Sequence, residues 1–267
     1  MPDLSPHRQF DLTGGSVFVY PRPVAEQVAA DRIAAEIRSR VAAKGRAVLG
    51  LATGSTPIAV YDRLAAAHEA GELSFDGVIT YNLDEYYPMS PADPASYRAF
   101  MDLHLFRRVR LPANRSHLLD GTIAEAHAED HARQFDGWVA ADGGLDFQLL
   151  GLGRNGHIGF NEPAELDLAA ALNLPTRLVD LHETTRADAV KDFPEAAAVP
   201  RQALTMGIAT ILAARSILVL AFGAGKADAV KRSLIGPMGS QVPGSLLQSA
   251  GPRVTWLLDE EAAAGLP

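Results

Sequence analysis

Short apolar runs alternate with longer amphipathic stretches along the chain. Runs rich in Val, Ile and Leu predict strands at residues 16–20, 47–52, 78–83, 147–152, 217–222 and 254–258. Apolar residues at helical spacing indicate helices near 24–41, 57–67, 97–106, 123–139 and 226–233. Because strands that alternate with helices are typical of a parallel sheet, the pattern predicts an α/β fold, with a mostly parallel central sheet and helices on both faces.

Composition narrows the class of protein. The 267 residues contain no apparent linker, repeat or low-complexity tract, so we expect a single domain over residues 1–267. The chain has no cysteine, which excludes disulfides and thiol nucleophiles. It shows no secretory signal and no apolar run long enough to span a bilayer. We therefore expect a cytoplasmic protein without a membrane partner, and the net charge of -8 argues against a nucleic-acid partner.

Four expected strands run directly into loops that carry polar or glycine residues. These loops are ATGST after residue 51, DEYY after 83, GRNGH after 152 and GAGK after 222. In open parallel sheets, ligands bind beyond the carboxyl ends of the strands. The arrangement predicts one site at that edge of the sheet.

Two of these loops are suited to phosphate. Gly54 permits a tight turn, and backbone N–H groups with the hydroxyls of Ser55 and Thr56 would cradle a phosphate at the start of a helix. Lys226 follows a second glycine turn, where a cation would neutralise the phosphate. The alternatives are an ordinary N-capped helix and a solvated lysine. Neither loop matches a Walker A or a dinucleotide-binding fingerprint.

The other two loops carry groups that move protons. Asp84 and Glu85 end an apolar strand, so at least one carboxylate is expected to face the ligand edge and act as a base; a helix cap or surface pair is the alternative. His157 lies among glycines, and Glu162 follows five residues later. A nearby carboxylate would orient the imidazole and stabilise its cation. No second His lies at ligand spacing, so we expect no metal.

With these motifs, the chain resembles the glucosamine-6-phosphate deaminase family, also called glucosamine-6-phosphate isomerase. The matching segments are LGLATGSTPIAVY (49–61), YNLDEYYPM with SYRAFM (81–101), LLGLGRNGHIGFNEP (149–163), HETTR (182–186), ALTMGIATIL (203–212) and FGAGKADAV (222–230). They cover most of the chain, and NLDEY combined with GHIGFNEP is specific.

The resemblance implies a Rossmann-like fold and a sugar-phosphate substrate. The reaction would convert D-glucosamine 6-phosphate and water to D-fructose 6-phosphate and ammonia without a cofactor. Asp84 resembles the base that moves a proton from C2 to C1, and His157 resembles the residue that assists ring opening, with Glu162 as its partner. The expected phosphate contacts are Ser55, Thr56, Arg186 and Lys226.

Two departures from the family pattern bear on catalysis and regulation. Asn155 stands where many members have Asp, so the charge that helps polarise the histidine is missing. We expect activity to survive with an altered pH profile. The segment after residue 163 lacks the Ser pair and basic residues of an effector site, which predicts an unregulated enzyme and leaves a homo-oligomer possible. Residues 164–198 are the candidate mobile cover of the site.

The sequence leaves three alternatives open. The hexosamine could be galactosamine 6-phosphate, because the residues that would read C4 are not identifiable. A 6-phosphogluconolactonase shares the fold but typically continues differently after the histidine. A non-catalytic sugar-phosphate sensor would need only the phosphate loops, whereas this chain keeps Asp84, His157 and Glu162.

Overall fold

The six expected strands lie in one eight-stranded sheet in the computed structural model, which describes residues 5–267. Its strands, in chain order, are β1 (Arg8–Leu12), β2 (Gly15–Val19), β3 (Ala47–Leu51), β4 (Val78–Asn82), β6 (Ser116–His117), β7 (Phe147–Gly151), β10 (Ile217–Ala221) and β11 (Val254–Leu258). Their order in the sheet is β1-β2-β11-β10-β7-β3-β4-β6. β1 pairs antiparallel with β2, and every other described pair in this sheet is parallel. The predicted α/β class is confirmed.

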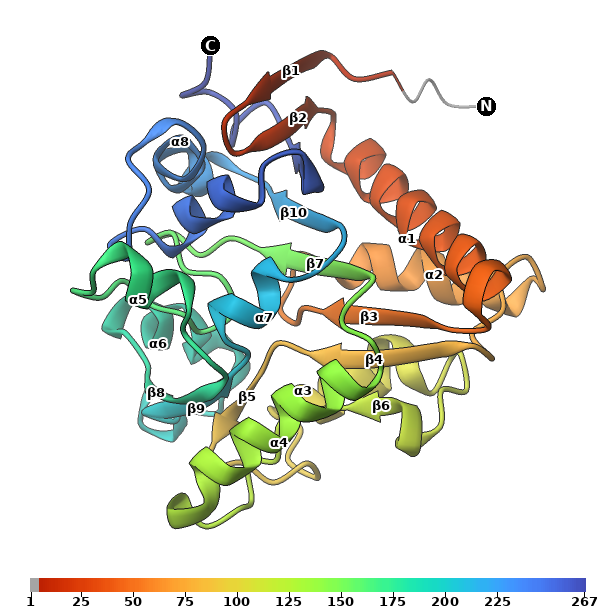
Figure 1. Ribbon diagram of the computed structural model, residues 1–267, viewed down its shortest axis with the longest axis vertical. Coiled ribbons are helices and arrows are strands. Elements are labelled where there is room, and N and C mark those ends of the chain that lie inside the picture. Colours follow the sequence, from red (N-terminus) through yellow and green to blue (C-terminus); the bar gives the residue numbers. More distant parts are fainter. Residues whose placement is uncertain (1–4) are drawn as a thin grey trace.

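The connecting helices form two groups. α1 (Arg22–Lys44) and α2 (Ile58–Glu69) pack side by side and lead towards β4, whereas α4 (Ala128–Ala141), α7 (Ile208–Leu212) and α8 (Ala227–Ile235) lead back towards β11 (Figure 1). Because parallel crossovers are right-handed, the two groups cover opposite faces of the sheet. The connection after β3 leads to β4 on one side, and the connection after its neighbour β7 leads to β10 on the other side. A switch point of this kind leaves a crevice beyond the ends of the two strands.

A second sheet stands beside the carboxyl ends of these strands (Figure 1). It has three antiparallel strands in the order β5-β9-β8: β5 (Asp84–Tyr87), β9 (Gln202–Thr205) and β8 (Arg177–Asp180). The chain leaves β4 at Asn82, and Leu83 bridges the two sheets: its N–H donates to Leu51, and its carbonyl accepts from Met206. This sheet was not predicted from the sequence.

Some helices are shorter than expected. The stretch expected near 123–139 becomes a 3-10 turn, Glu125–His127, followed by α4. The stretch 97–106 is α3 (Tyr97–Met101) continued by a π-helical turn, Asp102–Phe106. The expected cover, 164–198, contains α5 (Leu168–Leu172), β8 and α6 (Glu183–Ala189). Its mobility stays a prediction.

The main core consists of side chains from both faces of the large sheet, among them the fully buried Tyr61, Tyr81, Phe135 and Trp256. A smaller cluster lies under the second sheet and includes Tyr86, Met89, Phe160 and Leu181. The single domain stays a prediction. No helix within residues 5–267 is long and apolar enough to cross a membrane.

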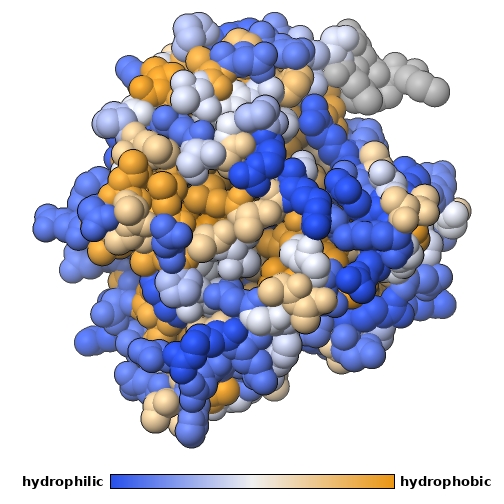
Figure 2. Space-filling model, in the orientation of Figure 1, coloured by the Kyte–Doolittle hydropathy of each residue, from blue (hydrophilic) through white to orange (hydrophobic). Residues whose placement is uncertain are grey.

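Hydrophilic residues cover most of the face in Figure 2, and hydrophobic residues gather over the region between α8 and α5. Among the exposed large hydrophobic residues are Leu166 and Leu168, near the start of α5, and Ile235, at the end of α8. A possible homo-oligomer stays a prediction.

Candidate active site

The four polar loops meet around one cavity of about 430 Å³ at the carboxyl ends of β3, β4, β7 and β10. Ser55, Asp84, His157 and Lys226, one from each loop, all line it. α6 closes another side with Thr185 and other side chains. The four loops thus converge at this edge of the sheet, as expected, whereas their use as one ligand site stays a prediction.

Asp84 lies at the buried side of this cavity. Asp84 is the first residue of β5, and it is 6% exposed. Burial raises the pKa of Asp84 to about 8, and the neighbouring Glu85 carboxylate adds to the rise. A hydrogen bond from the Thr53 hydroxyl acts in the opposite direction. A carboxylate with such a pKa is a stronger base than an ordinary aspartate near neutral pH.

The adjacent carboxylate has a different task. Glu85 accepts hydrogen bonds from the backbone N–H groups of Tyr86, Tyr97 and Arg98 at 2.9, 2.9 and 3.0 Å. The last two N–H groups belong to the first turn of α3. Each of the two interpretations of the Asp84-Glu85 pair describes the position of one residue: Asp84 lines the cavity and Glu85 caps a helix. The role of Asp84 as a base stays a prediction.

His157 contacts a network of side chains on the other wall. Its Nδ1 lies 3.3 Å from Oε2 of Glu162 and 3.3 Å from the hydroxyl of Thr185. Thr185 donates to Glu162 Oε1 at 2.6 Å, and Asn155 donates to Glu162 Oε2 at 2.9 Å. The Asn155 oxygen accepts from the His157 backbone N–H at 3.1 Å. Asn155 thus orients both members of the His157–Glu162 pair.

The charge on Glu162 is well supported. Burial is the largest influence on the pKa of Glu162 and acts to raise it, while the hydrogen bond and charge of His157 act to lower it. Hydrogen bonds from Thr185 and Asn155 add to this effect, so the pKa of Glu162 lies below its ordinary value. An ionised Glu162 therefore faces the imidazole of His157.

Two glycines allow close packing of the loop that carries His157. A β-carbon on Gly153 would lie 2.4 Å from the imidazole ring. Gly159 has φ of +57°, and a β-carbon there would lie 3.5 Å from Oδ2 of Asp84 and 3.1 Å from Oγ1 of Thr205. The histidine loop therefore packs directly against the wall that holds Asp84.

The expected phosphate loops line the same cavity. Gly54, with φ of +91°, turns the chain after β3, and Ser55 and Thr56 follow before α2. Lys226 lies opposite, after β10. Burial lowers the pKa of Lys226, while Asp188 acts to raise it. Backbone N–H groups, hydroxyls and an ammonium group form a suitable site for an anion.

Arg186 differs from the expectation. It is not among the described residues that line the cavity, and its Nη2 donates to the Val199 carbonyl at 3.5 Å. Its buried Nε has no hydrogen-bond partner within residues 5–267. The neighbouring Thr185 faces the network instead, because consecutive helical residues point in different directions.

Several residues of the site were missed by the sequence analysis. They are Arg22, Thr53, Tyr97, Arg154, Thr185, Asp188 and Lys191. Thr53 and Thr185 were within recognised motifs, ATGST and HETTR, but nothing in the sequence indicates which hydroxyl contacts which carboxylate. No group of three or more His, Asp or Glu side chains in residues 5–267 could hold a metal ion.

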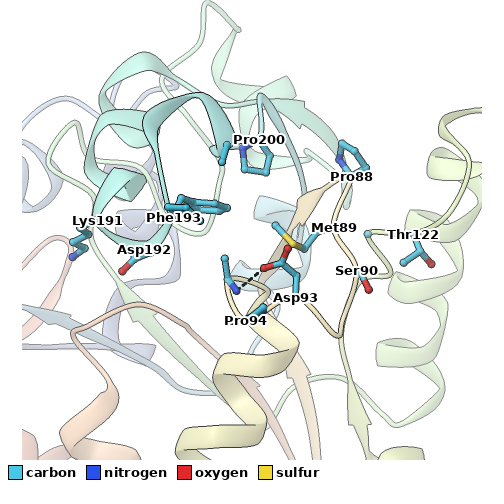
Figure 3. A pocket seen from close by; sticks show the side chains of 14 residues that line it. Pro88, Met89, Ser90, Asp93, Pro94, Thr122, Lys191, Asp192, Phe193 and Pro200 are labelled. Carbon is cyan, nitrogen blue, oxygen red and sulfur yellow. Dashed lines mark hydrogen bonds between the residues drawn. The ribbon is translucent and has the colours of Figure 1, made fainter.

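A second cavity of about 820 Å³ adjoins the first, and both are lined by Lys191 and Asp192. Figure 3 shows Phe193 and Pro200 facing Met89 and Pro94 across this cavity. Its walls are mainly apolar and lack the convergent charges of the first cavity. The converging polar and charged side chains therefore lie in the smaller of these two cavities.

Comparison with known proteins agrees with the motifs. The family model of glucosamine-6-phosphate isomerases and 6-phosphogluconolactonase matches residues 22–256, and the chain belongs to this family. The chain is 48% identical to the glucosamine-6-phosphate deaminase of Rhodopirellula baltica over 236 residues. This alignment spans 88% of this chain and 91% of the relative. The corresponding protein of Halothermothrix orenii is 44% identical over 228 residues, or 85% and 91% of the two chains.

A solved structure extends the likeness to three dimensions. The fold resembles that of a monomeric glucosamine-6-phosphate deaminase with a TM-score of 0.86 and 39% identity. The superposition covers 94% of this chain and 99% of the other. The family expected from the motifs is confirmed.

The Thr53 hydroxyl stabilises the ionised form of Asp84, which yields a prediction that needs no substrate. A Thr53→Val variant keeps the side-chain shape but loses this hydrogen bond, so the pKa of Asp84 should rise above its wild-type value of about 8. NMR titration of the carboxyl carbon measures the pKa. An unchanged or lower pKa in the variant would show that the hydroxyl does not support the charge.

Proposed function

We propose that this protein is a glucosamine-6-phosphate deaminase, which converts D-glucosamine 6-phosphate and water to D-fructose 6-phosphate and ammonia. The observation that carries the proposal is Asp84, a buried carboxylate with a pKa of about 8, in a cavity that also contains two phosphate-type loops. The relatives of known name that match most of the chain support the same activity.

The phosphate would bind first and orient the sugar. Ser55, Thr56 and Lys226 line the cavity, and their hydroxyls and ammonium group would hold the phosphate oxygens. Arg186 would contact the phosphate only after a change in the position of its side chain, since the guanidinium now faces the Val199 carbonyl. Binding energy at the phosphate then serves to align C1 and C2 with the catalytic groups.

The proton transfers use the two walls of the cavity. His157, supported by Glu162, would take the proton of the C1 hydroxyl and return it to the ring oxygen, which opens the ring. Asp84 would then remove the proton from C2 of the open-chain amino aldehyde while the C1 carbonyl oxygen takes up a proton, which gives an enol across C1 and C2. Delivery of the C2 proton to C1, with loss of one proton from the nitrogen, leaves a hydroxymethyl group at C1 and an imine at C2. The imine left at C2 is hydrolysed by water, which releases ammonia and the ketose. Asp84 and His157 belong to two of the four loops, and Glu162 follows the histidine loop five residues later. The cytoplasmic location and the absence of a cofactor stay predictions.

The proposed activity is tested by ammonia release from glucosamine 6-phosphate with the purified protein. Galactosamine 6-phosphate and 6-phosphogluconolactone serve as parallel substrates. We expect ammonia from the gluco substrate and no hydrolysis of the lactone. Turnover of the lactone with both amino sugars inert would reject the proposal, and preference for the galacto epimer would correct the substrate.

Replacement of Asp84 tests the base. An Asp84→Asn variant should lose about 10³-fold in kcat, the range of a general base, and should still bind inorganic phosphate in calorimetry. The variant should also resist heat better than wild type at pH 9. The folded carboxyl has a pKa of about 8, above its ordinary value of 3.8, so wild type loses stability as the pH rises between these values. Persistent turnover would assign the base elsewhere.

Asn155 determines how Glu162 responds to pH. In an Asn155→Asp variant two carboxylates face each other where the amide now donates to Glu162 at 2.9 Å. Like charges raise the pKa of such a pair, so the acidic limb of the kcat profile should move to higher pH while kcat stays within about tenfold. Asn173→Asp, at the exposed end of α5, is the matched control. Identical profiles for both variants would show that Asn155 has no electrostatic role.

A further inference from the structure

An ion pair joins two walls of the catalytic cavity. Arg154 follows β7, and Asp188 lies on α6. Nε of Arg154 donates to Asp188 Oδ2 at 2.9 Å, and Nη2 donates to Oδ1, so the contact is bidentate. Both side chains line the cavity together with the phosphate-type loops. The mechanism proposed above uses neither of them.

Arg154 lies against the loop that carries Lys226. A β-carbon on Gly225 would lie 3.8 Å from Cδ of Arg154, which places the side chain beside that turn. The pKa of Lys226, lowered first by burial, responds also to Asp188, Arg154 and Lys191. The cationic groups of Lys226, Arg154 and Lys191 therefore lie near one another. The carboxylate of Asp188 lies near the same groups. Their balance of two positive charges matches a phosphomonoester dianion.

The guanidinium presents to Asp188 the same geometry that it would present to phosphate. Arginine binds carboxylate and phosphate through two parallel hydrogen bonds. The side chains of Arg154 and Asp188 are 51% and 43% exposed, so the ion pair is hydrated and contributes little stability. Replacement of the carboxylate by a doubly charged phosphate therefore meets only a small barrier.

We propose that Arg154 is a further phosphate-binding residue and that Asp188 holds its guanidinium until the substrate's phosphate displaces the carboxylate. The identity of the phosphate compound rests on the proposed function. Asp188 acts as a competing anion in this scheme: it keeps Arg154 oriented towards the cavity, and it weakens the binding of any anion that cannot replace it.

The test is calorimetric binding of inorganic phosphate to the full chain. Asp188→Asn removes the competitor, so phosphate should bind about two- to fivefold more tightly, the range that an exposed ion pair spans. Arg154→Gln removes a charged hydrogen-bond donor, so phosphate should bind at least about tenfold more weakly. Asp228→Asn is the matched control, because it removes an equal charge from an exposed ion pair on α8 that does not line the cavity.

The NMR resonance of the Arg154 Nε–H group reports directly on the exchange of the Asp188 carboxylate for phosphate. It is assigned by its loss in Arg154→Gln. In wild type it should shift when phosphate is added, and in Asp188→Asn it should already be shifted before the addition. Equal or weaker phosphate binding by Asp188→Asn, unchanged binding by Arg154→Gln, or a resonance insensitive to phosphate would each overturn the proposal.

These measurements are independent of turnover. Phosphate binding that follows the expected order, in a protein that releases no ammonia, would reject the proposed function and leave the exchange intact. Ammonia release with the opposite order of binding would reject the exchange alone. Melting temperatures of the variants show whether each is folded, and a surface pair of this exposure should change them little.

Discussion

The burial of the Asp84 carboxylate is the constraint on which the site depends. The chain leaves the main sheet after Asn82 and enters the second sheet at Asp84, so the carboxylate is enclosed at the junction of the two. β9 pairs with this strand, and its Thr205 also receives the Phe160 N–H of the histidine loop at 3.0 Å. The second sheet thus shields Asp84 from water and fixes the position of the histidine loop relative to it.

The two carboxylates of the site differ in the direction of their pKa shifts. Burial and the neighbouring Glu85 carboxylate raise the pKa of Asp84 to about 8, whereas hydrogen bonds and His157 hold the pKa of Glu162 below its ordinary value. Asp84 can therefore accept and return a proton near neutral pH, while Glu162 stays charged and supports the imidazole. Asp84 lines the cavity directly, whereas Glu162 is not among the described lining residues and contacts His157, which does line it.

Much of this arrangement follows from local sequence. Apolar runs identify β3, β4, β7 and β10, and because parallel strands end at one edge, the loops after them had to converge. β5, β8 and β9 are short and pair over long sequence distances, so no local pattern indicates them. The task of Glu85, which caps α3, and the direction of Arg186 also depend on tertiary packing. Thr185 was missed for the same reason, since its role exists only once α6 reaches Glu162.

In the proposed mechanism, one shielded carboxyl moves a hydrogen from C2 to C1 of the sugar. Glucosamine 6-phosphate that carries deuterium at C2 tests it directly, with the label in the fructose 6-phosphate product located by NMR. Asp84 is 6% exposed, so exchange with solvent should compete poorly, and part of the deuterium should appear at C1. Complete loss of the label to water at the earliest times would contradict transfer by this buried group.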